Sequence, residues 1–171
     1  TDKRKGLTYF VEACKMLVEK YPEMKDTVGV VVFGQQSSQL ESMIPFPVYS
    51  MNYVSSEKEI VDIYNAVDLY VTPSLEDNLP NTIMEAMACG IPCIGFNVGG
   101  IPQMIDHLHN GYVARYKSSE DFANGIHWAL TESEYPNLSE EACRKVVSNY
   151  SERIIAKHYI DIYNKVTGSH A

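Results

Sequence analysis

The sequence lacks the features that mark four common classes of protein. No apolar run is long enough to cross a bilayer, and no stretch has the pattern of a secretory signal. Lysine and arginine together number 14 against 22 aspartate and glutamate residues, which gives a formal net charge of −8. A nucleic-acid-binding protein needs a basic face, so this balance argues against DNA or RNA as a partner. No Gly-x-Gly-x-x-Gly follows an early strand, which disfavours a dinucleotide-dependent dehydrogenase.

Cysteine is scarce and widely spaced. The four cysteines are Cys14, Cys89, Cys93 and Cys143, and no two of them form a Cys-x-x-Cys pair. A metal site would need closer clustering with histidine or acidic partners. We therefore expect buried, reduced thiols in a cytoplasmic protein, and no bound metal.

The apolar residues that are present follow a clear order. A chain of 171 residues, 45% of them apolar, is long enough for one domain, 1–171, with a continuous core. Helical three-and-four spacing alternates with valine-rich and other apolar runs, which predicts an α/β fold with a Rossmann-like, doubly wound parallel sheet and helices on both faces. We expect helices at about 5–20, 57–66, 81–89, 101–107, 119–130 and 139–165, and strands at 28–33, 48–53, 69–72, 92–96 and 112–116.

The end of the chain is expected to be less regular. Pro136 should break the chain before the closing helical region, which should itself break near 148–151. Three tyrosines in that region, Tyr150, Tyr159 and Tyr163, are expected to pack against the body of the domain or against a missing half.

The stretch 72–94 carries the strongest functional pattern. A strand is followed by an acidic loop and by a helix that opens near Pro80 and stops at Gly90. Asp77 and Glu85 bracket the start of this helix, with seven residues between them. Backbone N–H groups at a helix start can bind a phosphate, and two carboxylates can hold hydroxyl groups on either side of it. The spacing therefore suits a ligand that carries both kinds of group.

This stretch resembles the signature of the retaining, nucleotide-sugar-dependent glycosyltransferases of family 4, which have the GT-B fold. Their pattern is Pro-Ser, a Glu, seven residues, a second Glu, and then Ala-Met-Ala-x-Gly-x-Pro. Glu85 matches the second Glu, and Asp77 stands where the first is expected, with Glu76 beside it as an alternative. Asn78-Leu79-Pro80 replaces the Gly-Phe-Gly that follows the first acid in the family.

Five further segments resemble the family in the same order. They are Arg4-Lys5-Gly6 with the helix after it, 28–34, 60–68, 97–103 (where Gln103 replaces an acid) and 110–114. The resemblance implies the C-terminal, donor-binding half of a two-domain GT-B enzyme. Because that half opens with a strand in the family, we expect the first strand and the N-terminal acceptor domain to be absent from this chain.

The resemblance also implies an activity. A sugar would pass, with retention and without a metal or other cofactor, from a UDP-, GDP- or ADP-sugar donor to a glycan or lipid-linked acceptor held by the missing domain. The isolated chain is therefore expected to be inactive. Asp77 would be catalytic, and the donor-binding residues would be Lys5 at the diphosphate, Gln35 beside the base, Asn78, Leu79, Thr82 and Glu85.

The expected surroundings of these residues follow from the same comparison. Glu85 is expected to be a buried carboxylate that bonds the ribose hydroxyls, while Asp77 holds the sugar. Residues expected to meet at one edge of the sheet are Lys5, Gln35, Tyr53, Asp77 and the pair Gly99-Gly100, with Gln35 and the segment 51–54 lining the site of the base. The expected setting is bacterial polysaccharide assembly in the cytoplasm, with the full-length protein at the inner face of the cell membrane.

Two other functions stay open on the sequence alone. A non-catalytic sugar-nucleotide-binding module is favoured by Asp77 in place of Glu and by the lost Gly-Phe-Gly. A sugar-nucleotide epimerase has a similar architecture, although the segment 86–93 favours the transferase. Turnover of a donor by the full-length protein separates catalysis from binding alone.

Overall fold

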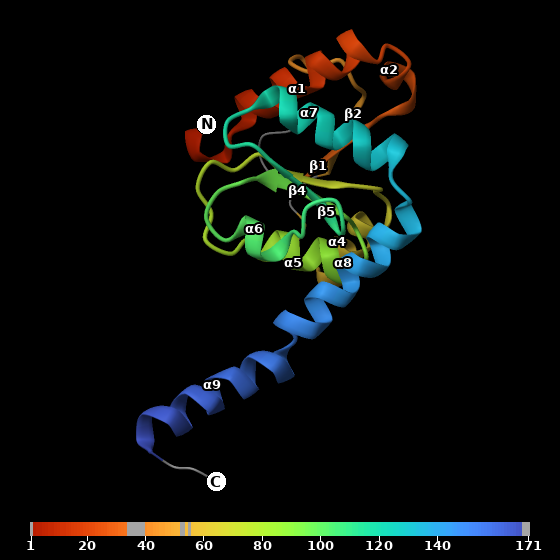
Figure 1. The fold of residues 1–171 in the computed structure, drawn as a ribbon. Coiled ribbons are helices and arrows are strands. Elements are labelled where there is room, and N and C mark those ends of the chain that lie inside the picture. The colour runs from red at the N-terminus through yellow and green to blue at the C-terminus, as the bar shows by residue number, and fades with distance from the viewer. Residues whose placement is uncertain (1, 34–39, 52–53, 55, 169–171) are drawn as a thin grey trace.

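Parallel strands lie between two layers of helices (Figure 1). The computed structural model describes residues 2–33, 40–51, 54 and 56–168. One parallel pair is formed by β1 (Val30–Phe33) and β2 (Val48–Met51). A second, three-stranded parallel sheet has the order β3 (Tyr70–Thr72), β4 (Cys93–Phe96) and β5 (Gly111–Ala114). Parallel strands sandwiched by helices confirm the predicted fold class.

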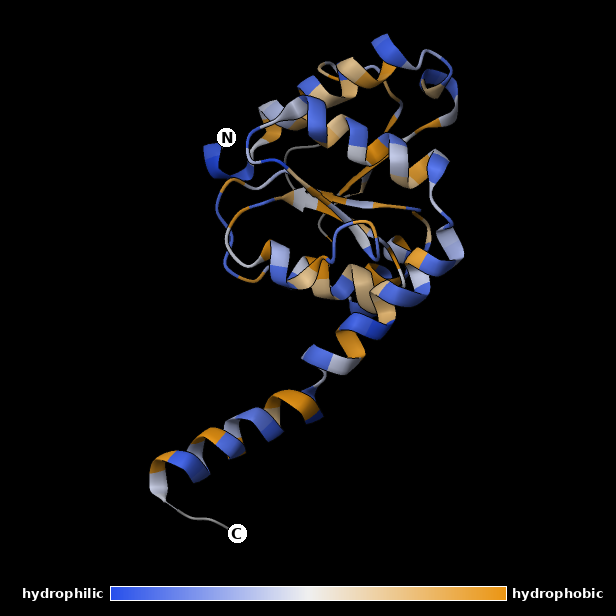
Figure 2. Ribbon diagram, in the orientation of Figure 1, coloured by the Kyte–Doolittle hydropathy of each residue, from blue (hydrophilic) through white to orange (hydrophobic). Residues whose placement is uncertain are grey.

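The central strand β4 shows why the core has two halves. All four of its residues are buried, and successive side chains of a strand point to opposite faces. Ile94 and Phe96 pack with α1 (Leu7–Lys20) and α7 (Ser119–His127). Cys93 packs on the other face with α5 (Asn81–Ala88) and α6 (Ile101–Met104). Figure 2 shows apolar ribbon where these helices face the strands and hydrophilic ribbon on much of their outer surface.

The remaining elements complete the two layers and extend beyond them. They are the 3-10 helix η1 (Lys3–Lys5), α2 (Met24–Thr27), α4 (Glu57–Asn65), the π-helical turn η2 (Trp128–Glu132), α8 (Tyr135–Tyr150) and α9 (Glu152–Thr167). No helix in the described part of the chain is both long enough and apolar enough to span a membrane.

Several predicted boundaries are wrong for identifiable reasons. The first α-helix starts at Leu7, because Gly6 adopts a left-handed conformation (φ +62°) and separates it from η1. The helix expected at 101–107 ends at Met104, and the one expected at 119–130 changes to a π-helical turn at Trp128. Pro136 does not break the chain. It lies in the first turn of α8, where a helix needs no N–H donor from it.

The closing region bends where the sequence predicted a break. Ser151 has an extended conformation between α8 and α9, and α9 projects away from the body (Figure 1). Tyr150 is half-buried, whereas Tyr159 and Tyr163 are 58% and 63% exposed. The expectation that all three pack against this domain is therefore wrong for Tyr159 and Tyr163. Their packing against a missing half stays a prediction.

The cysteines are free thiols. Cys14 and Cys93 are buried, and Cys89 and Cys143 are half-buried. Burial raises the pKa of the Cys14 thiol to about 12, so this group stays protonated at neutral pH. Cys14 packs in one half of the core and Cys93 in the other, each as a small apolar residue.

Candidate functional site

The loop between β3 and α5 lies at the carboxyl ends of the strands. Thr72 and Ser74 are both buried at its start, where the Thr72 hydroxyl donates a hydrogen bond of 3.2 Å to Ser74 Oγ. This bond fixes the point at which the chain leaves β3. The loop then passes through Glu76 and Asp77 and reaches Pro80, the residue before α5.

The residues around η1 are tied to this loop through backbone contacts. The Leu75 N–H donates to the Arg4 carbonyl oxygen over 2.7 Å. Gly6 lies so close that a Cβ at this position would come within 1.8 Å of the Pro73 carbonyl oxygen. Glycine is therefore required at position 6 by contact as well as by its left-handed φ. The arrangement places Lys5, with an exposed side chain, between two residues that touch the loop.

The turn after β4 closes on the same loop from the other side. Gly100 N–H donates to the Asp77 carbonyl oxygen over 3.1 Å. A Cβ at Gly99 would lie 1.8 Å from the Asp77 carbonyl oxygen, and one at Gly100 would lie 1.6 Å from that of Asn78. No side chain fits in this contact. Three segments distant in sequence therefore meet here: η1 with Gly6, the β3–α5 loop, and the Gly99-Gly100 turn.

Glu85 lies on α5 and is exposed, which corrects the expectation of a buried carboxylate. It is nevertheless held in place, because the Tyr64 hydroxyl donates to Glu85 Oε2 over 3.2 Å and also lies 3.3 Å from the Thr82 carbonyl oxygen. Tyr64 itself is only 2% exposed. A carboxylate at the surface is thus anchored by a hydroxyl that reaches it from the core.

The pKa of Tyr70 depends on its burial and on the charges of nearby acidic side chains. Burial raises the pKa of Tyr70 to about 12, with further contributions from the negative charges of Glu85 and Asp77. A hydrogen bond with the Thr82 side chain acts in the opposite direction. Asp77 and Glu85 therefore both act on one phenol. The charge of Glu76 instead acts on Arg4 and helps to raise its pKa.

The positive residues of η1 differ in their partners. Arg4 donates to Asp2, with Arg4 Nη2 2.8 Å from Asp2 Oδ2. This hydrogen bond is the main cause of the lowered pKa of Asp2, to which the charge of Lys5 contributes slightly. Arg4 is therefore neutralised locally, while Lys5 is left as an exposed cation beside the loop.

The start of α5 carries backbone donors. Pro80, its N-cap, provides no side-chain hydrogen bond, and the first turn contains no acidic residue. Helix-start N–H groups and the helix dipole favour an anion at this place. Asn78 and Leu79, which precede the helix, are exposed, and Thr82 is half-buried.

Some predicted positions lie outside this arrangement. Gln35 and Tyr53, predicted near the base, fall outside the described residues. Asp77, Glu85 and Lys5 do not line the cavity of about 390 Å³ found between β1 and β3. Within the described part of the chain, no group of three or more histidine, cysteine, aspartate or glutamate side chains is placed to hold a metal ion.

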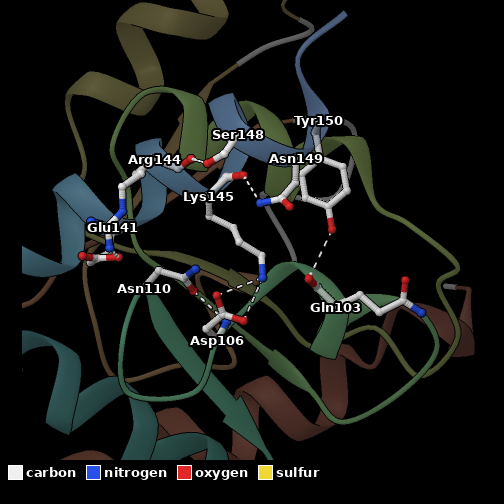
Figure 3. Close-up of polar contacts among 9 residues, drawn as sticks. All are labelled: Gln103, Asp106, Asn110, Glu141, Arg144, Lys145, Ser148, Asn149 and Tyr150. Atoms are coloured by element: carbon white, nitrogen blue, oxygen red, sulfur yellow. Dashed lines mark hydrogen bonds and ion pairs between the residues drawn. The ribbon is translucent and has the colours of Figure 1, made fainter. Parts of the chain in front are cut away.

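A second polar cluster was not foreseen from the sequence (Figure 3). Lys145 on α8 donates to both carboxylate oxygens of Asp106, over 2.8 and 2.9 Å. Tyr150 donates to the Gln103 carbonyl oxygen over 3.2 Å, and the Gln103 side chain points away from Tyr150 (Figure 3). Buried Asn110 accepts from the Asp106 N–H over 2.9 Å. The bonds of Lys145 and Tyr150 attach α8 to Asp106 and to Gln103 of α6, and the bond with Asn110 holds Asp106 in its turn.

Comparison with known proteins identifies one consistent set of relatives. A family model described as glycosyl transferases group 1 matches residues 1–132. An N,N'-diacetylbacillosaminyl-diphospho-undecaprenol alpha-1,3-N-acetylgalactosaminyltransferase of Campylobacter jejuni is 26% identical over 165 residues, which cover 95% of this chain and 42% of that protein. A UDP-Gal:alpha-D-GlcNAc-diphosphoundecaprenol alpha-1,3-galactosyltransferase of Escherichia coli is 26% identical over 150 residues, covering 85% and 38%. The chain spans less than half the length of these two proteins.

Solved structures share the fold. The C-terminal domain of a glycosyl transferase group 1 family protein (LpcC) from Francisella tularensis superposes with a TM-score of 0.71 at 23% identity, covering 89% of this chain and 83% of that one. Anabaena Alr3699/HepE in complex with UDP-glucose gives a TM-score of 0.76 at 18% identity, covering 96% and 46%.

Proposed function

Because the chain belongs to the glycosyl transferases group 1 family, we propose that it is the donor-binding, C-terminal half of a retaining glycosyltransferase. It would bind a nucleoside diphosphate sugar without a metal ion. The observation that carries the proposal is the backbone contact of η1 and of the Gly99-Gly100 turn with the β3–α5 loop, which carries Asp77 and leads to the uncapped start of α5. Helix-start N–H groups and a cation can bind the anionic part of a ligand, and nearby carboxylates can bind its hydroxyl groups.

The diphosphate would lie at the start of α5. The uncapped first turn offers N–H groups at its positive end, near Asn78, Leu79 and Thr82. Lys5 would add a mobile cation from η1. These groups would stabilise the negative charge that develops on the diphosphate when the bond to the sugar breaks.

The two carboxylates would divide the remaining contacts between them. The Tyr64 hydroxyl donates to Glu85 Oε2, and Glu85 Oε1 would accept hydrogen bonds from the ribose hydroxyls. Asp77, on the loop before the helix, would hold hydroxyl groups of the sugar and stabilise positive charge at the anomeric carbon. Gln35 would contribute to the site of the base, which the sequence leaves open among uracil, guanine and adenine.

The acceptor would be a glycan or a lipid-linked sugar. The two relatives named above carry diphospho-undecaprenol in their names, which supports a lipid-linked acceptor in polysaccharide assembly. Its binding residues would lie in an N-terminal domain outside this chain, and a lipid-linked acceptor would bring the full-length protein to a membrane surface.

Calorimetric titration of the full-length protein with UDP-, GDP- and ADP-sugars tests the donor. We expect one of the three to bind. Glu85→Ala should weaken its binding free energy by about 1.5–3 kcal/mol, because a charge-assisted hydrogen bond to the ribose is lost.

The anomeric configuration of the product, measured by NMR, tests retention. Donor binding without turnover on any lipid-linked or glycan acceptor would instead identify a binding module, and an unchanged affinity in Glu85→Ala would remove the ribose assignment.

A further inference from the structure

Two half-buried thiols lie where α5 packs against α8. Cys89 is the C-cap residue of α5, and Cys143 lies on α8. Both are free and half-buried, whereas Cys14 and Cys93 are buried in the core. Because oxidation of a cysteine depends on its exposure, a small oxidant reaches Cys89 and Cys143 more readily than the other two.

Gly90, directly after Cys89, allows the two helices to approach closely. A Cβ at this position would lie 2.7 Å from Ser139 Oγ, so a larger residue would push α8 away. Gly90 also has a left-handed conformation, with φ +75°, which favours glycine for a second reason. The carboxyl end of α5 therefore lies directly against α8 (Figure 1).

Cys143 belongs to the face of α8 that packs on α5. Ser139, Ala142, Cys143 and Val146 follow the spacing of three, four and seven residues that puts side chains on one face of a helix. Ala142 is fully buried in the core cluster that contains the apolar residues of α5, and Val146 and Cys89 pack against that same cluster. Cys143 lies one turn beyond the contact of Ser139 with Gly90, which places it beside the carboxyl end of α5.

The acid–base behaviour of Cys89 agrees with this placement. Burial raises the pKa of the Cys89 thiol, and the charges of Cys143 and Glu85 raise it further. Such an effect requires a group nearby in space. Glu85 meets this requirement because it lies one turn earlier on α5, where its carbonyl oxygen accepts from the Cys89 N–H over 3.2 Å. Cys143 meets it from a different helix.

We propose that Cys89 and Cys143 form a reversible disulfide when the protein meets a peroxide, and that this bridge is a redox-sensitive link between α5 and α8. Hydrogen peroxide first oxidises the Cys143 thiolate to a sulfenic acid and is itself reduced to hydroxide. The sulfur of Cys89 then attacks the sulfur of Cys143, so that the S–S bond forms and the sulfenic oxygen leaves as water with the Cys89 proton. Two thiols and one peroxide thus give one disulfide and two waters.

The order of these two steps follows from the environment of Cys89. Its raised pKa keeps the Cys89 thiol protonated at neutral pH, and a thiol reacts with peroxide more slowly than a thiolate does. Cys143 is therefore the residue oxidised first, and Cys89 is the residue that resolves the sulfenic acid. A dithiol reductant reverses the reaction by exchange.

The bridge changes how α8 is held. In the reduced protein α8 is attached by packing and by its bonds to Asp106 and Gln103, all of which can open together. The disulfide joins α8 covalently to α5 and closes a loop of roughly 50 residues, which restricts the open states most strongly. The inference rests on the packing of the two helices and does not depend on the proposed glycosyl transfer.

Peptide mapping of the full-length protein tests the bridge. The protein is treated with hydrogen peroxide, remaining thiols are blocked with N-ethylmaleimide, and the digest is analysed by mass spectrometry. We expect the peptides of Cys89 and Cys143 to be joined within one chain and to separate with dithiothreitol, while Cys14 and Cys93 stay unlinked. Hydrogen exchange of the segment 139–150 should slow about tenfold or more on oxidation, and exchange in α9 should change by less than about twofold.

Cys143→Ser is the matched control, because it preserves the size of the side chain and removes one sulfur. It should abolish both the joined peptide and the slower exchange, and Cys89→Ser gives the same readout if the first variant does not fold. Sulfinic acid or unreacted thiols at both positions, with no joined peptide, overturn the proposal. So does a bridge found only between two chains, with a yield that rises with protein concentration. A joined peptide without slower exchange in α8 overturns the link between the helices. No nucleotide is present, so the outcome is independent of donor binding.

Discussion

At the scale of single residues, Tyr64 gives the acidic site its geometry. Its ring is buried in the core that contains Ile83 and Met87, while its hydroxyl bonds an exposed carboxylate on Glu85. A flexible glutamate would otherwise lose more side-chain entropy on binding a ligand. The hydrogen bond from the buried phenol thus orients Glu85 before a ligand binds, and it lowers the entropy cost of binding.

Tyr64→Phe should reveal this positioning role. It removes one hydroxyl and leaves the apolar packing, so we expect the full-length protein to fold and to bind nucleoside diphosphates about 3- to 10-fold more weakly, equivalent to about 0.5–1.5 kcal/mol. Affinity for the corresponding 2',3'-dideoxynucleotide, measured by calorimetry, should not change. Tyr112→Phe is the matched control, since its hydroxyl bonds Asp121 over 3.1 Å outside the site. An equal loss with both nucleotides would assign Tyr64 a purely structural role.

The choice between the two neighbouring acids is also a matter of single residues. Asp77 is half-buried and its backbone contacts the Gly99-Gly100 turn, whereas Glu76 is exposed, which favours Asp77 as the sugar-facing group. Asp77→Asn keeps the shape of the side chain and removes its charge. We expect it to spare binding of the free nucleoside diphosphate and to lower kcat of the full-length enzyme by roughly 10- to 100-fold. Glu76→Gln should leave both nearly unchanged. The reverse result would place the first acid of the motif at position 76.

At the scale of elements, the short helix η1 matters more than the sequence suggested. The apolar spacing predicted a helix from about residue 5, but Gly6 ends one element and starts another. The reason is a tertiary contact with Pro73, which no local pattern reveals. The start of a helix between Asp77 and Glu85 was predicted from the sequence, and α5 begins there, at Asn81. The anchoring by Tyr64 was missed, because a tyrosine on an apolar helix face indicates only a core position.

The position of η1 leads to a prediction about charge. Lys5 lies between two residues that contact the β3–α5 loop, so its cation should meet the diphosphate. Lys5→Ala should weaken binding of a nucleoside diphosphate to the full-length protein about 10-fold and leave nucleoside binding unchanged, with the difference shrinking at high salt. Lys3→Ala removes the same charge from the same turn and serves as the control. Equal weakening of nucleoside and nucleoside diphosphate would contradict a contact with phosphate.

At the scale of the whole molecule, strand pairing limits what the sequence can predict. Each of the five strands was expected from its apolar run, and each exists. The division between β1–β2 and β3–β4–β5 could not be predicted, because pairing joins residues far apart along the chain. The Lys145–Asp106 pair is equally long-range, and it helps to attach α8 to the body.

These last helices differ sharply in their attachment, and this leads to a prediction about stability. α8 buries Leu138 and Ala142 and bonds Asp106 and Gln103, whereas α9 buries no residue. Ending the chain after Ser151 should therefore shift Tm by no more than about 2 °C, since few contacts are lost. It should also reduce self-association in sedimentation experiments, because an exposed apolar surface is removed.

Ending the chain after Ser133 is the matched comparison for this experiment. It removes α8 as well, and the loss of buried Leu138 alone should cost about 2–5 kcal/mol. We expect this shorter chain to lose cooperative unfolding, as followed by circular dichroism on heating. The bend at Ser151 then marks the limit of the stable unit. Two truncations with equally lowered Tm would show that α9 packs on the body in solution, contrary to its exposed course in Figure 1.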